Sequence, residues 1–271
     1  MKFYSTKPNS SKKAIALGAA ALLASFTLLP QFASASICYG NCGTLGTDGD
    51  VTTSPKGGTY DYVSTFDGAD DAPNLGIGSE TNGSVFQTDT FAALAGDSLE
   101  FYFNFVTSDG TVSFIEYAWA RLLNEDLTES ALLFTARTNP DGTSTVPGVG
   151  LPPLQATINP SSALINDGAS NWSALGSSSG SCYGGIGAGC GSTGWVQSLF
   201  DISDAGNYIL EFGVTNWGDT SFQTGMAYDG ITVGGVSIDP DESNLVPAPA
   251  TLALFGLGLA GIGWSRRKKH R

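Results

Sequence analysis

One stretch of the chain alternates apolar and polar side chains with a period of two. Residues 98–105 read SLEFYFNF, which places Leu99, Phe101, Phe103 and Phe105 on the same side of an extended backbone. Successive side chains of a strand point to opposite faces of its sheet, so this period predicts a strand with one buried face. Gly-Asp before the stretch and Ser-Asp-Gly after it are turn sequences that delimit the strand.

Strand signals of this kind recur along the chain, with almost no helical periodicity between them. The further segments are 59–66, 84–91, 111–123, 131–138, 207–214 and 226–238, the last read as one closing strand or a pair. Many short strands separated by Gly and Asp turns indicate an all-β fold, and we expect a β-sandwich or jelly roll. We assign it to one body at residues 36–245, which is long enough for a single sizeable core.

The N-terminal segment, residues 1–35, reads as a secretory signal peptide. Four lysines precede an apolar stretch at residues 14–29, and Ala33-Ser34-Ala35 follows as a small-residue cleavage site. We expect an apolar signal helix that is removed after Ala35. An N-terminal membrane anchor is the alternative reading.

The C-terminal segment, residues 246–271, reads as a short membrane helix with a basic end. Residues 252–264 are apolar apart from glycines. With their flanks they span roughly 20–23 Å as a helix, against a hydrocarbon core of about 30 Å. The basic residues that follow are expected to stop transfer and stay cytoplasmic; they are Arg266, Arg267, Lys268, Lys269 and Arg271.

This tail resembles a PEP-CTERM sorting signal. The resemblance rests on Val246-Pro247-Ala248-Pro249, the short Leu/Gly-rich helix and the basic end, although Ala248 stands where the family usually has Glu. It implies an exported protein of a Gram-negative bacterium whose tail is recognised and cut by an exosortase. The helix would then hold the inner membrane only transiently, and the processed protein would reach the cell surface or the medium. A plain C-terminal anchor is the alternative.

The body also resembles a secreted β-sandwich family that carries such tails. The resemblance rests on the stretches FNFVTSDG, YAWARLLNED and GSCYGGIGAGCGSTGW. It implies no transferable function for the body.

Charge within the body restricts its partners. All 25 acidic residues lie between Asp48 and Glu242, and only Lys56, Arg121 and Arg137 oppose them, which leaves a formal net charge of −22. Binding of nucleic acid requires basic side chains that neutralise phosphates, so we expect no nucleic-acid partner. Such a surface instead attracts cations.

The four cysteines are expected to form disulfides, because an even number of cysteines in an exported chain indicates disulfide pairing. Of the three pairings we favour Cys38–Cys42 and Cys182–Cys190, since each closes a short Gly-containing loop. The second would fix the Gly/Ser/Pro-rich excursion at residues 139–192, which is otherwise very long for a loop. A zinc site is the alternative, but paired C-x-x-C spacing is missing.

No motif of the body predicts catalysis. Residues 176–180 fit G-x-S-x-G, but the sole histidine is His270, in the tail, and a nucleophile elbow needs a histidine partner. Paired carboxylates could serve glycoside chemistry, yet no pattern marks Glu100, Glu116 or Glu211 as buried or paired. We therefore expect a protein that is not an enzyme.

Two features suggest binding instead. The turn that holds Asp67, Asp70 and Asp71 offers carboxylates of the kind that Ca²⁺ takes, without EF-hand spacing; an ordinary solvated acidic loop is the alternative. Trp172, Trp195 and Trp217 lie in or beside loops, and exposed aromatic rings can stack on sugars, although Trp is more often a core residue.

These observations predict an exported, exosortase-sorted, non-catalytic protein of the cell surface or extracellular matrix, and the resemblance to PEP-CTERM proteins implies that it is associated with exopolysaccharide. One alternative is a carbohydrate-binding module. Another is an adhesive or ice-binding surface protein, although no regular Thr-x-Thr ladder is present.

Overall fold

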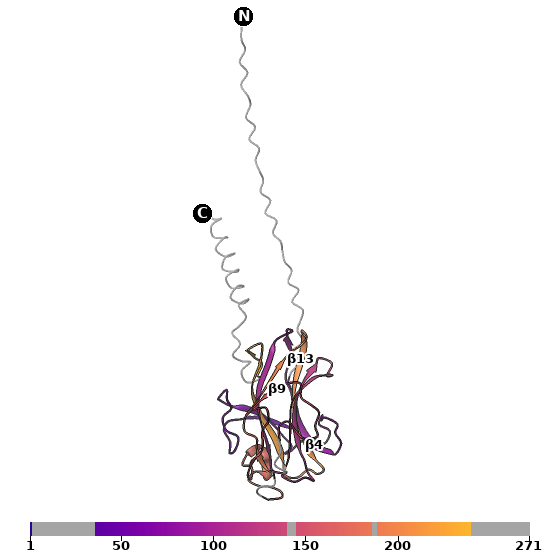
Figure 1. Ribbon diagram of the computed structural model, residues 1–271, viewed down its shortest axis with the longest axis vertical. Helices are drawn as coiled ribbons and strands as arrows, with labels where there is room; N and C mark the ends of the chain where they lie inside the picture. The colour runs from indigo at the N-terminus through magenta and orange to yellow at the C-terminus, as the bar shows by residue number, and fades with distance from the viewer. Residues whose placement is uncertain (2–35, 140–144, 186–188, 240–271) are drawn as a thin grey trace, which may run out of the picture. The chain divides into compact units, whose positions relative to one another are not determined.

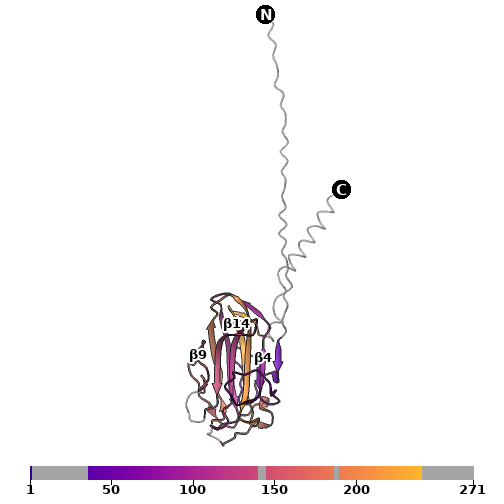
Figure 2. The ribbon, with the colours of Figure 1, turned by 90° about the vertical axis from the view of Figure 1, so that its right-hand side faces the viewer.

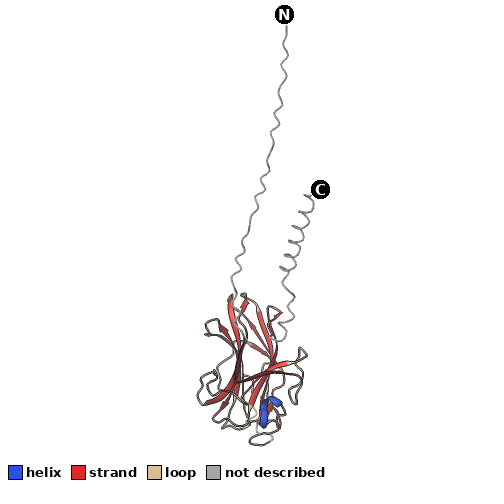
Figure 3. Ribbon diagram, turned by 180° about the vertical axis from the view of Figure 1, so that it is seen from behind, coloured by secondary structure: helices blue, strands red, loops and turns tan. Residues whose placement is uncertain are grey.

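The computed structural model describes Met1 and residues 36–139, 145–185 and 189–239 (Figure 1). The predicted signal peptide and the predicted sorting tail lie outside these described residues. The described part of the body is nearly all β, in agreement with the predicted class (Figure 3). Within those ranges, no helix has the length and apolar character needed to cross a bilayer.

Sheet A forms one layer of the body. Its strands are antiparallel and follow the spatial order β1 (Ile37–Tyr39), β4 (Glu80–Gln87), β13 (Gly206–Trp217), β7 (Tyr117–Asn124) and β8 (Glu129–Arg137). The short strand β5 (Phe91–Ala93) also pairs with β13, beyond the end of β4.

Sheet B forms the other layer. Its path runs β10 (Asn166–Asp167), β11 (Gly191–Ser192), β6 (Ser98–Thr107), β14 (Thr224–Val233), β3 (Tyr60–Ser64) and β2 (Asn41–Leu45). Figure 2 labels β14 of this sheet. Off this path, β12 (Val196–Asp201) pairs with β6 and with β9 (Thr157–Asn159), and β15 (Val236–Ser237) pairs with β14. One 3₁₀ helix, η1 (Ser173–Ser178), completes the described elements.

The main core lies between the two sheets and confirms the predicted face of β6. Leu99, Phe101 and the two further phenylalanines of that alternation are completely buried. The ring of Phe101 meets Phe212 of β13 edge-on at 5.1 Å, and Phe212 stacks on Tyr228 of β14 at 3.9 Å. Aromatic side chains of both sheets thus interdigitate, as sandwich packing requires.

The outer face of each sheet is also covered. On sheet A, Tyr117 and Trp119 form a second cluster beneath Leu75, Ile77 and Leu151. On sheet B, a third cluster places residues of the 172–175 segment over outward-facing side chains of β3, β6 and β14. The excursion at residues 139–192 therefore supplies cover to both sheets, which explains how so long a connection is held.

Two predicted strands differ from the observed ones. The segment 111–123 becomes a strand only at Tyr117, because Thr111 to Ser113 form a turn that the carboxylate of Asp109 holds. The segment 84–91 is divided between β4 and β5. The closing segment 226–238 is a pair, β14 and β15, as one of the two readings predicted.

Candidate functional site

Polar side chains replace apolar ones at one end of the sandwich core. The inward-facing series of β6 ends in Thr107, and that of β14 begins at Thr224; their hydroxyl oxygens lie 2.7 Å apart. Glu116 and Asn216 occupy the corresponding end of sheet A. All four residues are completely buried. This end of the core is therefore a polar layer, which we call the polar end.

Strand register places Glu116 beside Asn216. Tyr117 of β7 pairs with Thr215 of β13, so the next position opposes Glu116 to Asn216. On the other side of Glu116, the amide of Thr138 donates to its carbonyl oxygen at 3.0 Å, and the Thr138 hydroxyl donates to Oε2 at 3.3 Å. Side chains directly opposite each other on neighbouring strands have Cβ atoms about 4.5–5.5 Å apart, so the two polar groups are neighbours.

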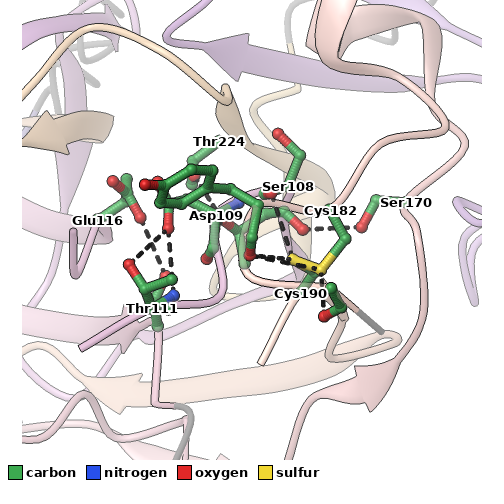
Figure 4. The surroundings of a disulfide bond; sticks show 12 residues. Ser108, Asp109, Thr111, Glu116, Ser170, Cys182, Cys190 and Thr224 are labelled. Carbon is green, nitrogen blue, oxygen red and sulfur yellow. Dashed lines mark hydrogen bonds between the residues drawn. A yellow bond between two sulfur atoms is a disulfide. The ribbon is translucent and has the colours of Figure 1, made fainter. Parts of the chain in front are cut away.

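Asp109 reaches the polar end from the loop that follows β6. Its Oδ1 accepts hydrogen bonds from the amide of Thr111 at 3.1 Å and from the Thr111 hydroxyl at 3.2 Å. The Cys182–Cys190 disulfide lies next to this loop (Figure 4). The amide of Tyr183 donates to the carbonyl oxygen of Ser108 at 2.9 Å. The disulfide-bridged segment thereby supports the position of Asp109.

Among the residues that the structure describes, three buried oxygens at the polar end have no hydrogen-bond partner: Oδ2 of Asp109, Oε1 of Glu116 and Oδ1 of Asn216. The amide orientation of Asn216 is fixed, because its Nδ2 donates to Oδ1 of Asn82 at 3.0 Å and to Oε1 of Gln223 at 3.3 Å. The large majority of buried polar atoms in proteins do have a partner. Three unpartnered acceptors in one region therefore need an explanation.

The electrostatic environment of the polar end disfavours the ionised forms of Asp109 and Glu116. Burial, with a contribution from the charge of Asp219, raises the pKa of Asp109 to about 6. Burial, together with the charges of Asp109 and Asp219, raises the pKa of Glu116 well above its ordinary value. Desolvation and like charge both oppose the ionised forms, and the described residues provide neither group with a salt bridge.

Glu211 is also a buried carboxylate, but both of its oxygens have hydrogen-bond partners. It accepts hydrogen bonds from Nε2 of Gln87 at 2.8 Å, Nε1 of Trp119 at 3.0 Å and Nε of Arg121 at 2.6 Å. Sequence reasoning marked neither Glu116 nor Glu211 as buried. The alternation of β13 places Glu211 on the outward face of the strand. The sequence did not indicate that other side chains bury this face.

A shallow hollow of about 170 Å³ gathers three other aspartates. Each of them has a partner: Asp61 accepts from the hydroxyl of Thr44 at 2.6 Å, Asp229 from the hydroxyl of Ser54, and Asp239 from the amide of Gly230 at 3.2 Å. The aspartates of this hollow thus have hydrogen-bond partners, whereas three oxygens of the polar end have none among the described residues.

The predicted cysteine pairing is confirmed. Cys38 bonds to Cys42 and Cys182 bonds to Cys190. The first disulfide joins β1 of sheet A to β2 of sheet B, and the second fixes the excursion, as predicted.

The predicted calcium ligands are not brought together. Asp67, Asp70 and Asp71 are all exposed. Nowhere in the described ranges do three or more His, Cys, Asp or Glu side chains form a group that could hold a metal. These findings favour the alternative reading, an ordinary solvated acidic loop.

The predicted tryptophan platform requires a correction. Trp172 is only 1 % exposed and donates through Nε1 to the hydroxyl of Tyr60 at 3.1 Å, so it is a core residue. Trp195 packs in the same outer cluster of sheet B, whereas Trp217 packs on sheet A, where the guanidinium of Arg137 lies 4.6 Å from its ring. The three rings therefore do not share a surface.

An aromatic group that sequence reasoning missed lies beside the second disulfide. The ring of Tyr183 is 4.9 Å from that of Phe222 and 5.7 Å from that of Phe114, and Tyr183 is 42 % exposed. These rings come from three separate loops, so no sequence period could have joined them. We call Phe114, Tyr183 and Phe222 the aromatic cap.

The sorting residues, Val246 to Pro249 and the basic end, lie outside the described residues, but a family comparison covers all of them except Lys269 and Arg271. Residues 245–268 match the PEP-CTERM protein-sorting motif. This motif implies an exported protein that an exosortase processes, at the surface or outside a Gram-negative cell. The comparisons with curated proteins and with solved structures give no match, so the resemblance of the body to a secreted β-sandwich family stays a prediction.

Proposed function

We propose that this chain is a non-catalytic protein of the cell surface or extracellular matrix that associates with exopolysaccharide after exosortase processing. The observation that carries the proposal is the sorting motif at residues 245–268, which follows directly on a disulfide-bonded β body. A body of this kind suits an oxidising location outside the cytoplasm.

The state of the acidic residues supports a role without catalysis. A general acid or base must come within hydrogen-bond reach of its substrate. The carboxyl groups of Glu116 and Glu211 are 0 % and 1 % exposed, and that of Glu211 is fully engaged by its neighbours. Neither group meets a molecule in solvent, so both serve the interior of the protein.

The sorting step is tested by following the tail in the native host. A C-terminal epitope should be lost from the surface form of the wild-type chain. Replacement of Pro247 and Pro249 with Ala should leave a membrane-bound precursor that keeps the epitope, because Pro249 holds Ala248 in an extended conformation that suits presentation to a protease. An epitope that persists on the wild-type surface form would establish a plain tail anchor instead.

The association with polysaccharide is tested separately. An internally tagged chain should sediment with the matrix of the wild-type host and appear in the free medium of a strain that makes no exopolysaccharide. Equal retention in both strains would contradict the association while leaving the sorting step intact.

A second candidate, a carbohydrate-binding module, is favoured by the aromatic cap. Exposed aromatic rings supply flat, amphipathic contact area, and Tyr183 presents such a ring beside two others. A glycan array should give signals that Tyr183→Ala abolishes. Tyr39→Ala is the matched control, since Tyr39 is 43 % exposed on β1. An array without signal, or an equal loss for both variants, would exclude the cap as a sugar site.

A further inference from the structure

We infer that Asp109, Glu116 and Asn216 form a buried calcium site at the polar end of the sandwich core. This site is separate from the acidic turn that the sequence suggested, and it does not depend on the proposed association with polysaccharide.

The first argument is the chemistry of the unpartnered atoms. All three are oxygens, two from carboxyl groups and one from an amide, and each is a hydrogen-bond acceptor. Ca²⁺ binds carboxylate and amide oxygens, usually six to eight of them. The absence of sulfur or imidazole from this set disfavours the softer transition metals. Neighbouring backbone carbonyls, hydroxyls or water would complete the coordination.

The second argument is that a water molecule is a poor substitute. A single water donates at most two hydrogen bonds, whereas three acceptors are unpartnered. Water also provides no charge to balance Asp109 and Glu116 when they are ionised, and an unpaired buried charge is strongly destabilising. A divalent cation can bind all three oxygens and balance both charges.

The third argument is that, among the described residues, no basic side chain forms a salt bridge with Asp109 or Glu116. The only basic residues of the body are Lys56, Arg121 and Arg137. Lys56 pairs with Glu100 at 3.2 Å, and Arg121 pairs with Glu211 at 2.6 Å.

Arg137 is directed elsewhere as well. Its Nε donates to the carbonyl oxygen of Ile115 at 3.1 Å, its Nη1 donates to that of Val149 at 3.3 Å, and its guanidinium lies over the ring of Trp217. The charge of Arg137 still attracts Glu116 from a distance, but among the described residues no salt bridge joins it to Glu116 or to Asp109. A bound cation would supply the charge that balances both carboxylates.

The surroundings keep the ligands in place. Asn216 belongs to β13, Glu116 directly precedes β7, and a hydrogen bond from the Thr138 hydroxyl holds one oxygen of Glu116. Asp109 is held by its turn and by the disulfide-bridged segment beside it. Ligands on strands and on a cross-linked loop lose little conformational freedom when an ion binds.

The test uses the full chain, extracted from the host and freed of metal with a chelator. Calorimetric titration with CaCl₂ should show one ion per chain, and Ca²⁺ should raise Tm in a concentration-dependent way, as linkage requires for a ligand of the folded state. Elemental analysis of the chain before chelation should show calcium.

Three variants and one control decide the location of the site. Glu116→Gln, Asp109→Asn and Asn216→Ala should each remove the calorimetric signal and the Ca²⁺-dependent change in Tm. Because Glu116→Gln keeps the shape of the side chain and removes a group whose ionisation is opposed by burial, the variant should melt no lower than the metal-free wild type, which shows that it folds. The double variant Asp70→Asn, Asp71→Asn alters the exposed turn and should bind Ca²⁺ as the wild type does.

Several results would overturn the inference. They are no binding to the metal-free chain, undiminished binding by Glu116→Gln, loss of binding in the turn variant, or an equal rise in Tm with Na⁺ at matched ionic strength.

Discussion

At the scale of single residues, Glu211 shows how this fold holds a charge away from water. Its carboxylate lies on the outward face of β13 and is covered by the second cluster of sheet A. Three donors from neighbouring strands bind it, and Arg121 balances its charge. Removal of either Arg121 or Glu211 should therefore destabilise the protein, because it leaves the other residue as a buried charge without a partner.

We expect Arg121→Met to lower the free energy of unfolding by about 3 kcal/mol, since it leaves Glu211 buried and charged. Urea denaturation at neutral pH measures the change. Glu129→Gln is the control, because Glu129 is a weaker and more exposed partner of Arg121 at 3.7 Å, and exposed pairs contribute little, about 0–1 kcal/mol. Similar effects of the two substitutions would contradict this account of Glu211.

Glu80 gives a prediction for the pH dependence of stability. Burial alone raises the pKa of Glu80, but hydrogen bonds from the hydroxyl of Tyr117 and the amides of Ile77 and Gly78 outweigh it, and the pKa lies below its ordinary value of 4.5. A carboxyl group with a depressed pKa in the folded state stabilises the protein above the ordinary pKa. That stability is lost as the pH falls through the folded pKa.

The stability lost in Glu80→Gln should therefore be largest near neutral pH and should shrink as the pH falls below 4.5. Urea denaturation across this range gives the difference from wild type. Glu125→Gln, at an exposed carboxylate, controls for the removal of one charge. A Glu80→Gln effect that is independent of pH would show that the hydrogen bonds do not favour the ionised form.

The sequence could not identify the residues of the polar end. Glu116 has no charged neighbour in sequence, and its burial follows from strand register and from the loop that carries Asp109. Asn216 lies at the end of a strand whose alternation was recognised only to Val214. Such groups are brought together by pairing between strands that are about 100 residues apart, and no local pattern records it.

At the scale of elements, predictions from periodicity succeeded where one face of a strand is buried. The alternation of β6 was assigned to the correct face because its other face carries polar or smaller groups. In β7, Tyr117 and Trp119 face outward while Ala118 and Ala120 face the core, so both faces are buried. A strand that is buried on both faces loses its alternation, and the cover that buries it comes from distant loops.

Trp172 tests how tightly one such loop packs on its sheet. A Cβ atom at Gly225 of β14 would lie 2.5 Å from Cζ3 of Trp172 and 3.0 Å from the carbonyl oxygen of Val63. Gly225→Ala should therefore destabilise the protein by about 1–3 kcal/mol through overpacking. The urea midpoint measures this change.

Gly46→Ala is the matched control, because no atom lies within 4 Å of the added methyl group. Its effect should stay within about 0.5 kcal/mol, as for other surface changes. Equal tolerance at both glycines would mean that the 172–175 segment does not pack firmly on sheet B.

At the scale of the whole molecule, the charge of the body sets its response to salt. With 25 acidic and three basic residues the body carries −22 charges, and a large net charge destabilises a compact state through self-repulsion. The screening length shortens from about 10 Å at 0.1 M salt to about 3 Å at 1 M. NaCl should therefore raise the urea midpoint of the metal-free protein.

Replacement of Asp67, Asp70 and Asp71 with Asn removes three charges and takes the body from −22 to −19. This variant should show a smaller rise with NaCl than the wild type. A midpoint that does not respond to salt in either protein would mean that the charges are too widely spaced to repel one another.

The two disulfides also determine how the body behaves under a mechanical load. They bridge residues only four and eight positions apart, so neither joins distant parts of the chain. A surface protein that is pulled at both ends is held together by its strand pairing and core alone. Once these rupture, each residue extends by about 3.3–3.6 Å. Because intact disulfides prevent the bridged loops from extending, they shorten the extended chain by only on the order of 40 Å out of a contour length of roughly 700 Å. The reach of the extended body is therefore almost the same in the oxidised and the reduced protein.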